Sequence, residues 1–119
     1  MAKQVFEGVK VVDFGWIVVG PSAPRYLANH GATVVRIESM TRLEGSRLMA
    51  PHKDFTPGIN RSGLFPVIND SKYGISLNLN HPKGPEVAKR LVQWADVAVE
   101  GMTPGTMKRW GLDYESCRR

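Results

Sequence analysis

The chain has 119 residues, a length that favours one domain with a modest hydrophobic core. Its 16 lysines and arginines outnumber its 11 acidic residues, for a net charge of +5, but the two signs are interleaved, which disfavours nucleic acid as a partner. No apolar run reaches the roughly 20 residues of a membrane span, and the N-terminus lacks a secretory signal. The single cysteine, Cys117, excludes an internal disulfide and favours a cytoplasmic protein.

The first third of the chain predicts a strand, a helix and a second strand. Residues 8–13 are rich in valine, as is typical of a strand buried on both faces. Pro21 suits the first position of a helix, and Gly31 suits the position just after its last turn. Residues 32–37 form the next apolar run. This succession predicts a βαβ unit with parallel strands.

The segment 39–74 lacks a periodic pattern and carries prolines, glycines and many charges. We expect one long irregular loop here. Loops of this length within a compact domain usually serve a function.

The last third predicts the same alternation again. Residues 75–79 form a short strand, Pro82 opens a helix whose apolar stripe ends at Trp94, and residues 96–100 form another strand. Trp94 is expected in the core. A final helix over 113–119 has no strand after it, so we expect the chain to be the front part of a longer protein. The predicted fold class is α/β, with an open, mostly parallel, Rossmann-like sheet of four strands and helices on both faces.

Two strand ends predict a binding site. The strand ending near Glu100 runs into a Pro-Gly turn and then into Lys108 and Arg109. The first strand likewise runs into the turn 15–20 and a helix start. Such ends of an open α/β sheet bind ligands because free backbone N–H groups point outward there, so we expect an anionic, nucleotide-like ligand. The turn 15–20 lacks the glycine spacing of dinucleotide sites and the lysine of a P-loop, which argues against NAD.

Other candidate residues have two interpretations each. Asp13 and Asp96 lie at strand ends, where a carboxylate can be tuned for proton transfer, but each is better explained as a turn cap or a local ion-pair partner. Trp16 and Trp110 lie in turns and could either stack on an adenine or pack against the protein. The histidines lack metal-ligand spacing. We therefore predict no catalytic residue and no metal site.

A series of motifs extends over nearly the whole chain. Its order and spacing resemble the family III CoA-transferases (CaiB/BaiF), the group of formyl-CoA:oxalate CoA-transferase, carnitine CoA-transferase and α-methylacyl-CoA racemase. The motifs are FEGVKVVD at 6–13, Gly20-Pro21, GATVVRIE at 31–38, NDSK at 69–72, ISLNL at 75–79, PKG at 82–84, ADVAVE at 95–100, Pro104-Gly105, Arg109, Gly111 and Tyr114-Glu115.

The resemblance implies that residues 1–119 are the N-terminal part of a domain in which coenzyme A lies across the strand ends. It implies acyl-CoA and an acceptor carboxylic acid as substrates and an interlocked homodimer as the assembly. Relatives often have an asparagine and an aromatic residue in place of Gly101-Met102, a lysine in place of Asn80, and an arginine in place of Ser39, for which Arg42 or Arg47 could substitute. The CoA-binding positions that match are Val18, Val19, Leu77, Asn80, Gly101, Met102, Arg109 and Trp110.

The family's catalytic aspartate, and the acid–base pair of its racemases, would lie beyond residue 119. The resemblance therefore implies CoA transfer through an aspartyl intermediate for the longer relatives, with α-methylacyl-CoA racemisation as the alternative. Two further hypotheses stay open for the chain itself. One is a catalytically silent nucleotide-binding fragment, and the other is a small basic nucleic-acid-binding domain. We also expect self-association, because a partial sheet exposes an unpaired edge.

Overall fold

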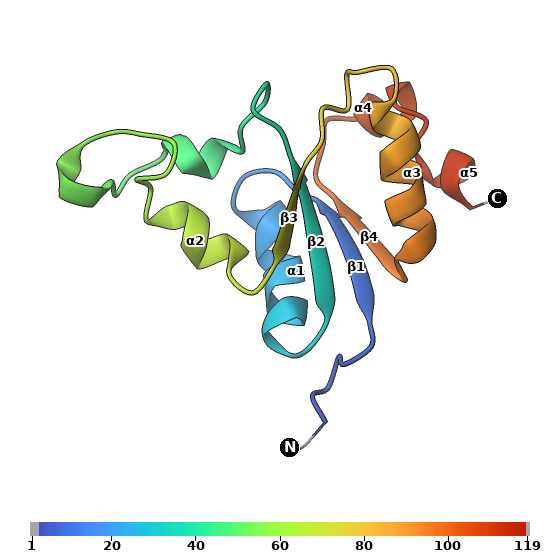
Figure 1. The fold of residues 1–119 in the computed structure, drawn as a ribbon, viewed down its shortest axis with the longest axis horizontal. Coiled ribbons are helices and arrows are strands. Elements are labelled where there is room, and N and C mark those ends of the chain that lie inside the picture. Colours follow the sequence, from blue (N-terminus) through green and yellow to red (C-terminus); the bar gives the residue numbers. More distant parts are fainter. Residues whose placement is uncertain (1–2, 119) are drawn as a thin grey trace.

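The computed structural model describes residues 3–118 as an α/β fold around a four-stranded, all-parallel sheet (Figure 1). The strands are β1 (Lys10–Phe14), β2 (Thr33–Glu38), β3 (Tyr73–Ser76) and β4 (Val97–Glu100). Their order in the sheet is β3-β2-β1-β4, which is the order of the first four strands of a dinucleotide-binding sheet. The predicted fold class is confirmed.

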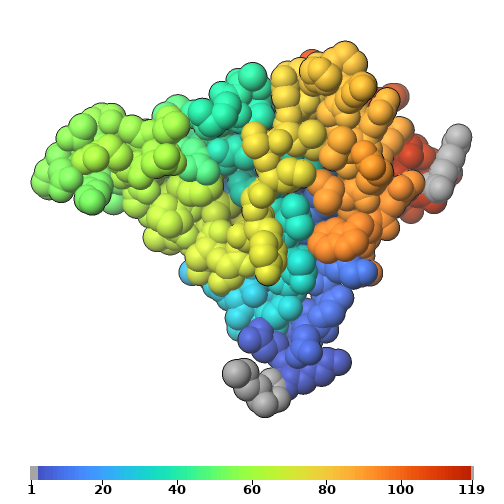
Figure 2. Space-filling model, viewed as in Figure 1, coloured from blue at the N-terminus to red at the C-terminus, as the bar shows by residue number. Residues whose placement is uncertain are grey.

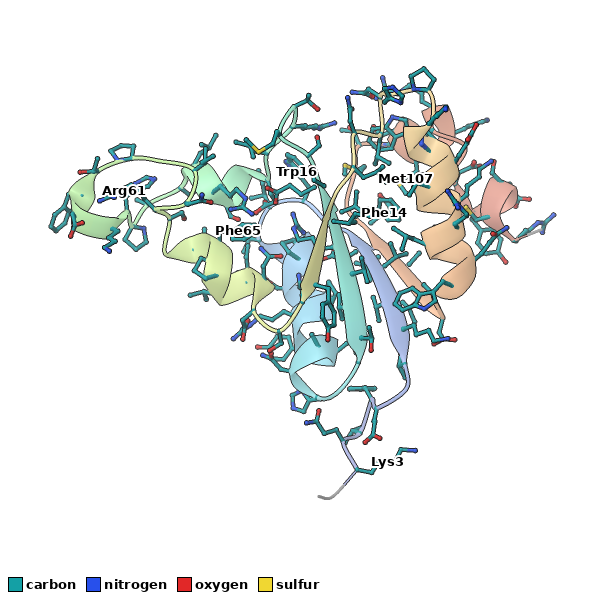
Figure 3. All side chains as sticks on the ribbon, viewed as in Figure 1. Lys3, Phe14, Trp16, Arg61, Phe65 and Met107 are labelled. Atoms are coloured by element: carbon teal, nitrogen blue, oxygen red, sulfur yellow. The ribbon has the colours of Figure 1, made fainter. Side chains whose placement is uncertain are left out.

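Helices cover both faces of the sheet. Successive side chains of β1 point to opposite faces, and because those of residues 11–14 are all buried, both faces must be covered. Val11 and Val34 pack with Ala28 of helix α1 (Val19–Asn29) on one face. Val12 and Phe14 pack on the other face, against the helices α3 (Gly84–Trp94), α4 (Thr106–Arg109) and α5 (Tyr114–Cys117). Figure 3 shows Phe14 and Met107 directed into this second core.

The segment 39–74 is not the single irregular loop that we expected. It contains the short 3-10 helices η1 (Gly45–Leu48) and η2 (Lys53–Phe55) and the helix α2 (Leu64–Asn69), which packs beside α1. The prolines of this segment misled the prediction. Pro66 is the third residue of α2, and the N–H groups of the first four residues of a helix have no carbonyl partner within it, so a proline there removes no helical hydrogen bond. Residues between η1 and α2 form an arm that stands away from the body (Figure 2).

Several predicted boundaries also move. Strand β3 begins at Tyr73, two residues early, because Tyr73 and Gly74 pair with β2. Helix α1 begins at Val19, so Pro21 is its third residue rather than its first. Helix α3 begins at Gly84 rather than at Pro82.

The placement of Trp94 in the core was wrong. Its side chain lies at the end of α3 with 36% of its surface exposed. The ammonium group of Lys10 lies 5.8 Å from the ring centroid, a contact that suits an aromatic residue at the protein surface.

Candidate functional site: a groove across the strand ends

The turn after β1 is built by two glycines that touch. A Cβ on Gly15 would lie 2.5 Å from the carbonyl carbon of Gly20, so no side chain fits there. Between them Ile17 and Val18 have positive φ angles of 32° and 43°, which branched side chains rarely adopt. The buried carboxylate of Glu44 accepts the N–H of Ile17 at 2.9 Å and so holds the turn from outside. This turn fixes the position of Trp16.

Trp16 lies at the carboxyl end of the sheet, above Phe14 (Figure 3). The guanidinium of Arg42 lies 4.8 Å from the centroid of the indole ring. Relatives often have an arginine where this chain has Ser39, and Arg42 or Arg47 was expected to take its place. Arg42 lies beside the strand ends, whereas Arg47 is paired with Glu38. No local sequence pattern predicted this stack, because its partners come from different loops.

The turn after β3 meets the end of α4. Leu77 extends the β2–β3 pairing by donating its N–H to Glu38 at 2.7 Å. Three residues later, Asn80 accepts a hydrogen bond from the indole N–H of Trp110 at 3.1 Å. This bond joins parts of the chain 30 residues apart and fixes the ring of Trp110 beside Arg109.

A groove follows from these contacts. It comprises a small hollow of about 40 Å³ beside Trp16 and a larger one of about 300 Å³ beside Arg109, and the two share part of their walls. We call it the strand-end groove, and its polar and aromatic residues are Phe14, Trp16, Glu38, Ser39, Arg42, Asn78, Asn80, His81, Arg109 and Trp110.

Most of the predicted CoA-binding residues meet at this groove, namely Leu77, Asn80, Met102, Arg109 and Trp110. Gly101 lies next to it: a Cβ at this position would lie 3.8 Å from the backbone nitrogen of Trp16. Val18 and Val19 do not line it; they lie exposed at the start of α1.

Arg109 is an accessible cation of the groove. Its side chain is exposed and makes one hydrogen bond in the described part of the chain, a long one of 3.4 Å to the hydroxyl of Thr106. A guanidinium with free donors binds phosphate in a bidentate manner, and the neighbouring face of Trp110 suits a flat ring. The groove can therefore hold a ligand that combines an anionic group with an aromatic base.

Asp13 belongs to a different structure, a cluster buried on the α1 face. One of its oxygens accepts the N–H of Gly15 at 2.7 Å, which is the predicted turn cap. The other lies 2.8 Å from the ammonium of Lys72 and 3.3 Å from the guanidinium of Arg36. We call Asp13, Arg36 and Lys72 the buried ion cluster. Burial lowers the pKa of Lys72, and the nearby carboxylate of Asp13 opposes that shift.

Asp96 has a structural contact as well. Its carboxylate accepts the N–H of Lys10 at 2.9 Å and ties the start of β4 to that of β1. Within residues 3–118, no group of three histidine, cysteine or acidic side chains is arranged to hold a metal ion. None of the helices in that range is long and apolar enough to cross a membrane.

An open parallel sheet with a cationic groove at its carboxyl edge is typical of α/β proteins that bind nucleotides. Residues 6–119 match the model of CoA-transferase family III, and the chain belongs to that family.

The similarity extends to curated relatives and to solved structures. The chain is 34% identical to formyl-CoA:oxalate CoA-transferase of Streptomyces coelicolor over 97% of its own length and 27% of that protein. It is 31% identical to succinyl-CoA–D-citramalate CoA-transferase of Chloroflexus aurantiacus, over 92% of its own length and 26% of that protein. A CAIB/BAIF family protein from Brucella suis superimposes with a TM-score of 0.85 at 29% identity, covering 98% of this chain and 31% of that one. The chain thus spans between a quarter and a third of these relatives.

Proposed function

We propose that this chain is the CoA-binding N-terminal part of an enzyme that moves CoA between carboxylic acids. The observation that carries the proposal is the meeting of Arg109, Trp110 and Asn80 at one groove on the carboxyl edge of a parallel sheet. Arg109 would bind a phosphate of CoA, and Trp110 or Trp16 would pack against its adenine. Arg42, stacked on Trp16, supplies a second cation for the nucleotide.

The chemistry would use an aspartate that lies in the relatives' sequence beyond the part matching residue 119. Its carboxylate attacks the thioester carbonyl of the donor and expels the CoA thiolate, which leaves a mixed anhydride. The thiolate then attacks the aspartyl carbonyl and releases the first acid, forming an aspartyl-CoA thioester. The acceptor carboxylate repeats these steps in reverse order. The part of this reaction assigned to the present chain is to bind and orient CoA.

CoA transfer is favoured over α-methylacyl-CoA racemisation because the relatives described above are CoA-transferases by name. By the same likeness, the donor would be an acyl-CoA and the acceptor a carboxylic acid. We further propose a homodimer and a cytoplasmic location. A chain without the catalytic aspartate would bind nucleotide and catalyse nothing by itself.

Isothermal titration of the 119-residue chain with CoA and with 3′-dephospho-CoA tests the groove. We expect CoA to bind, and removal of its 3′-phosphate to weaken binding. Arg109→Ala should weaken CoA binding roughly tenfold or more, since a hydrogen bond to a charged group contributes about 1.5–3 kcal/mol.

Arg90→Ala is the matched control, because Arg90 is an exposed arginine on α3 that does not line the groove. It should leave CoA binding unchanged. Equal losses in both variants would indicate a general charge effect rather than a site. The absence of heat from a chain shown by circular dichroism to be folded would refute CoA binding by this part of the protein.

A further inference from the structure

A second cavity, of about 340 Å³, lies on the α1 face and adjoins the strand-end groove at Glu38 and Ser39. Its floor consists of Arg36 and Glu38 from β2 with Gly74 and Ser76 from β3, which lie side by side in the parallel register. Phe65 of α2 forms part of its wall. Figure 3 shows Phe65 between the sheet and the arm.

Arg36 directs unused donors into this cavity. Its side chain is only 4% exposed, and its Nη1 donates to Asp13 and, at 3.1 Å, to the carbonyl of Gly15. Its Nε and Nη2 have no hydrogen-bond partner within the described residues. These two N–H groups form one side of the guanidinium, the fork that matches the two oxygens of a carboxylate. A buried donor without a partner is energetically costly, so a bound acceptor here would remove that cost.

The cavity also holds an unused acceptor. Glu38 is paired through Oε1 with Arg47, whose guanidinium lies 3.6 Å from the centroid of Phe65. Its Oε2 is buried, lacks a hydrogen-bond partner among residues 3–118, and lies 3.7 Å from Nε of Arg36. That separation is too long for a direct hydrogen bond. A hydroxyl group beside Oε2 could donate to Glu38 and leave the Nε–Nη2 side of Arg36 to another acceptor.

The net charge at the cavity favours an anion. The lining of the cavity carries three positive charges, from Arg36, Arg47 and Lys72, and one negative charge, from Glu38. The buried carboxylates of Asp13 and Glu44 act on Lys72 from outside the lining. Lys72 donates to Asp13, to the carbonyl of Pro21 and to the side chain of Asn69, so its ammonium contributes charge rather than a free donor.

Gly74 keeps the cavity open. It pairs in register with Arg36, so a side chain at this position would project beside the guanidinium. A Cβ built there meets no atom within 4 Å, and its φ angle is not positive. The strand backbone would therefore accept a larger residue, which would fill the cavity without strain.

We propose that this cavity binds a small hydroxycarboxylate, with its carboxylate on the Nε–Nη2 side of Arg36 and its hydroxyl group beside Oε2 of Glu38. The inference does not rest on the proposed CoA groove: the two sites adjoin at Glu38 and Ser39, but neither Arg109 nor Trp110 lines the cavity.

Isothermal titration with malate, succinate and inorganic phosphate tests the site, and amide chemical shifts of Gly74 and Ser76 locate it. We expect malate to bind about 2- to 13-fold more tightly than succinate, the fold-change for one hydrogen bond of 0.5–1.5 kcal/mol. Gly74→Val should weaken malate binding at least tenfold, and Gly74→Ala should do so to a smaller extent. Thr33→Val, an exposed change elsewhere in the sheet, is the matched control and should leave binding unchanged.

Both glycine variants should remain folded by circular dichroism and keep their affinity for CoA. Malate binding that survives in folded Gly74→Val overturns the proposal, as does the absence of malate binding to the folded wild-type chain. Tighter binding of phosphate than of malate would contradict the ligand class. A failure of CoA to bind would not affect any of these outcomes.

Discussion

The buried ion cluster and the strand-end groove lie at the same edge of one sheet and use their charges in opposite ways. Asp13 and Phe14 are consecutive in β1, yet one faces α1 and the other faces α3. On the α1 side the charges of Asp13 and Lys72 are almost fully buried and satisfy each other. On the α3 side the guanidinium of Arg109 is exposed and makes one weak contact.

The difference shows that a charged residue at a strand end is a sign of ligand binding only where its donors are left free. Charged side chains at a strand end that pair with each other stabilise the fold instead. Substitutions of Asp13 and Lys72, the paired members of the buried ion cluster, should therefore change stability, whereas substitutions of Arg109 in the groove should change affinity.

The largest expected effect is that of Asp13→Asn on folding. The variant keeps the shape of the side chain but leaves Arg36 and Lys72 buried without their counter-charge. Breaking a buried pair in this way typically costs about 3–5 kcal/mol. Urea unfolding followed by circular dichroism should show this loss in the free energy of unfolding.

Arg109→Ala serves as the comparison in the same experiment. It removes an exposed side chain of the groove and should change the free energy of unfolding by no more than about 0.5 kcal/mol. Similar losses in the two variants would remove the distinction between the two regions.

A smaller loss of stability is expected for Glu44→Ala, which sharpens the comparison because Glu44 is buried yet supports the groove. Its carboxylate accepts the N–H of Ile17 and the hydroxyl of Ser46. Leaving these donors without an acceptor should cost about 1–3 kcal/mol of unfolding free energy. The turn that carries Trp16 should loosen as well, which the chemical shift of its indole N–H would report. An unchanged shift together with unchanged stability would contradict this role.

The sequence predicted the parts of this molecule that depend on local pattern. Runs of valine and the glycine after α1 were enough to place the strands on a parallel sheet. That the turns after β1 and β4 bind a ligand stays a prediction. Five of the eight CoA-binding positions that the family resemblance implied lie together in the groove, and their role in binding stays a prediction.

The rest depends on contacts between distant parts of the chain. Lys72 stands 59 residues from Asp13, and nothing in either local sequence specifies that they pair. The stack of Arg42 on Trp16 and the bond from Trp110 to Asn80 likewise join separate loops. Trp94 fell on the apolar stripe of its helix, but it is the last residue of α3 and 36% of its surface is exposed, so periodicity alone placed it wrongly.

The smallest expected effect concerns an ion pair at the surface, between Arg25 of α1 and Asp70 after α2. The hydrogen bond from Arg25 lowers the pKa of Asp70 below its ordinary value of 3.8. The pair therefore stabilises the fold above pH 3.8, and this contribution is lost as the pH falls through the lower pKa of the folded state. Water screens such an exposed pair, so Asp70→Asn should lower the urea midpoint only slightly at pH 6, and by progressively less as the pH falls below 3.8. Arg25→Gln should cause the same small fall at pH 6 in the wild-type chain and none in the Asp70→Asn background. A fall that persists in that background would show that Arg25 stabilises α1 through packing of its aliphatic carbons. The contrast with the buried ion cluster would then reflect buried apolar surface as well as buried charge.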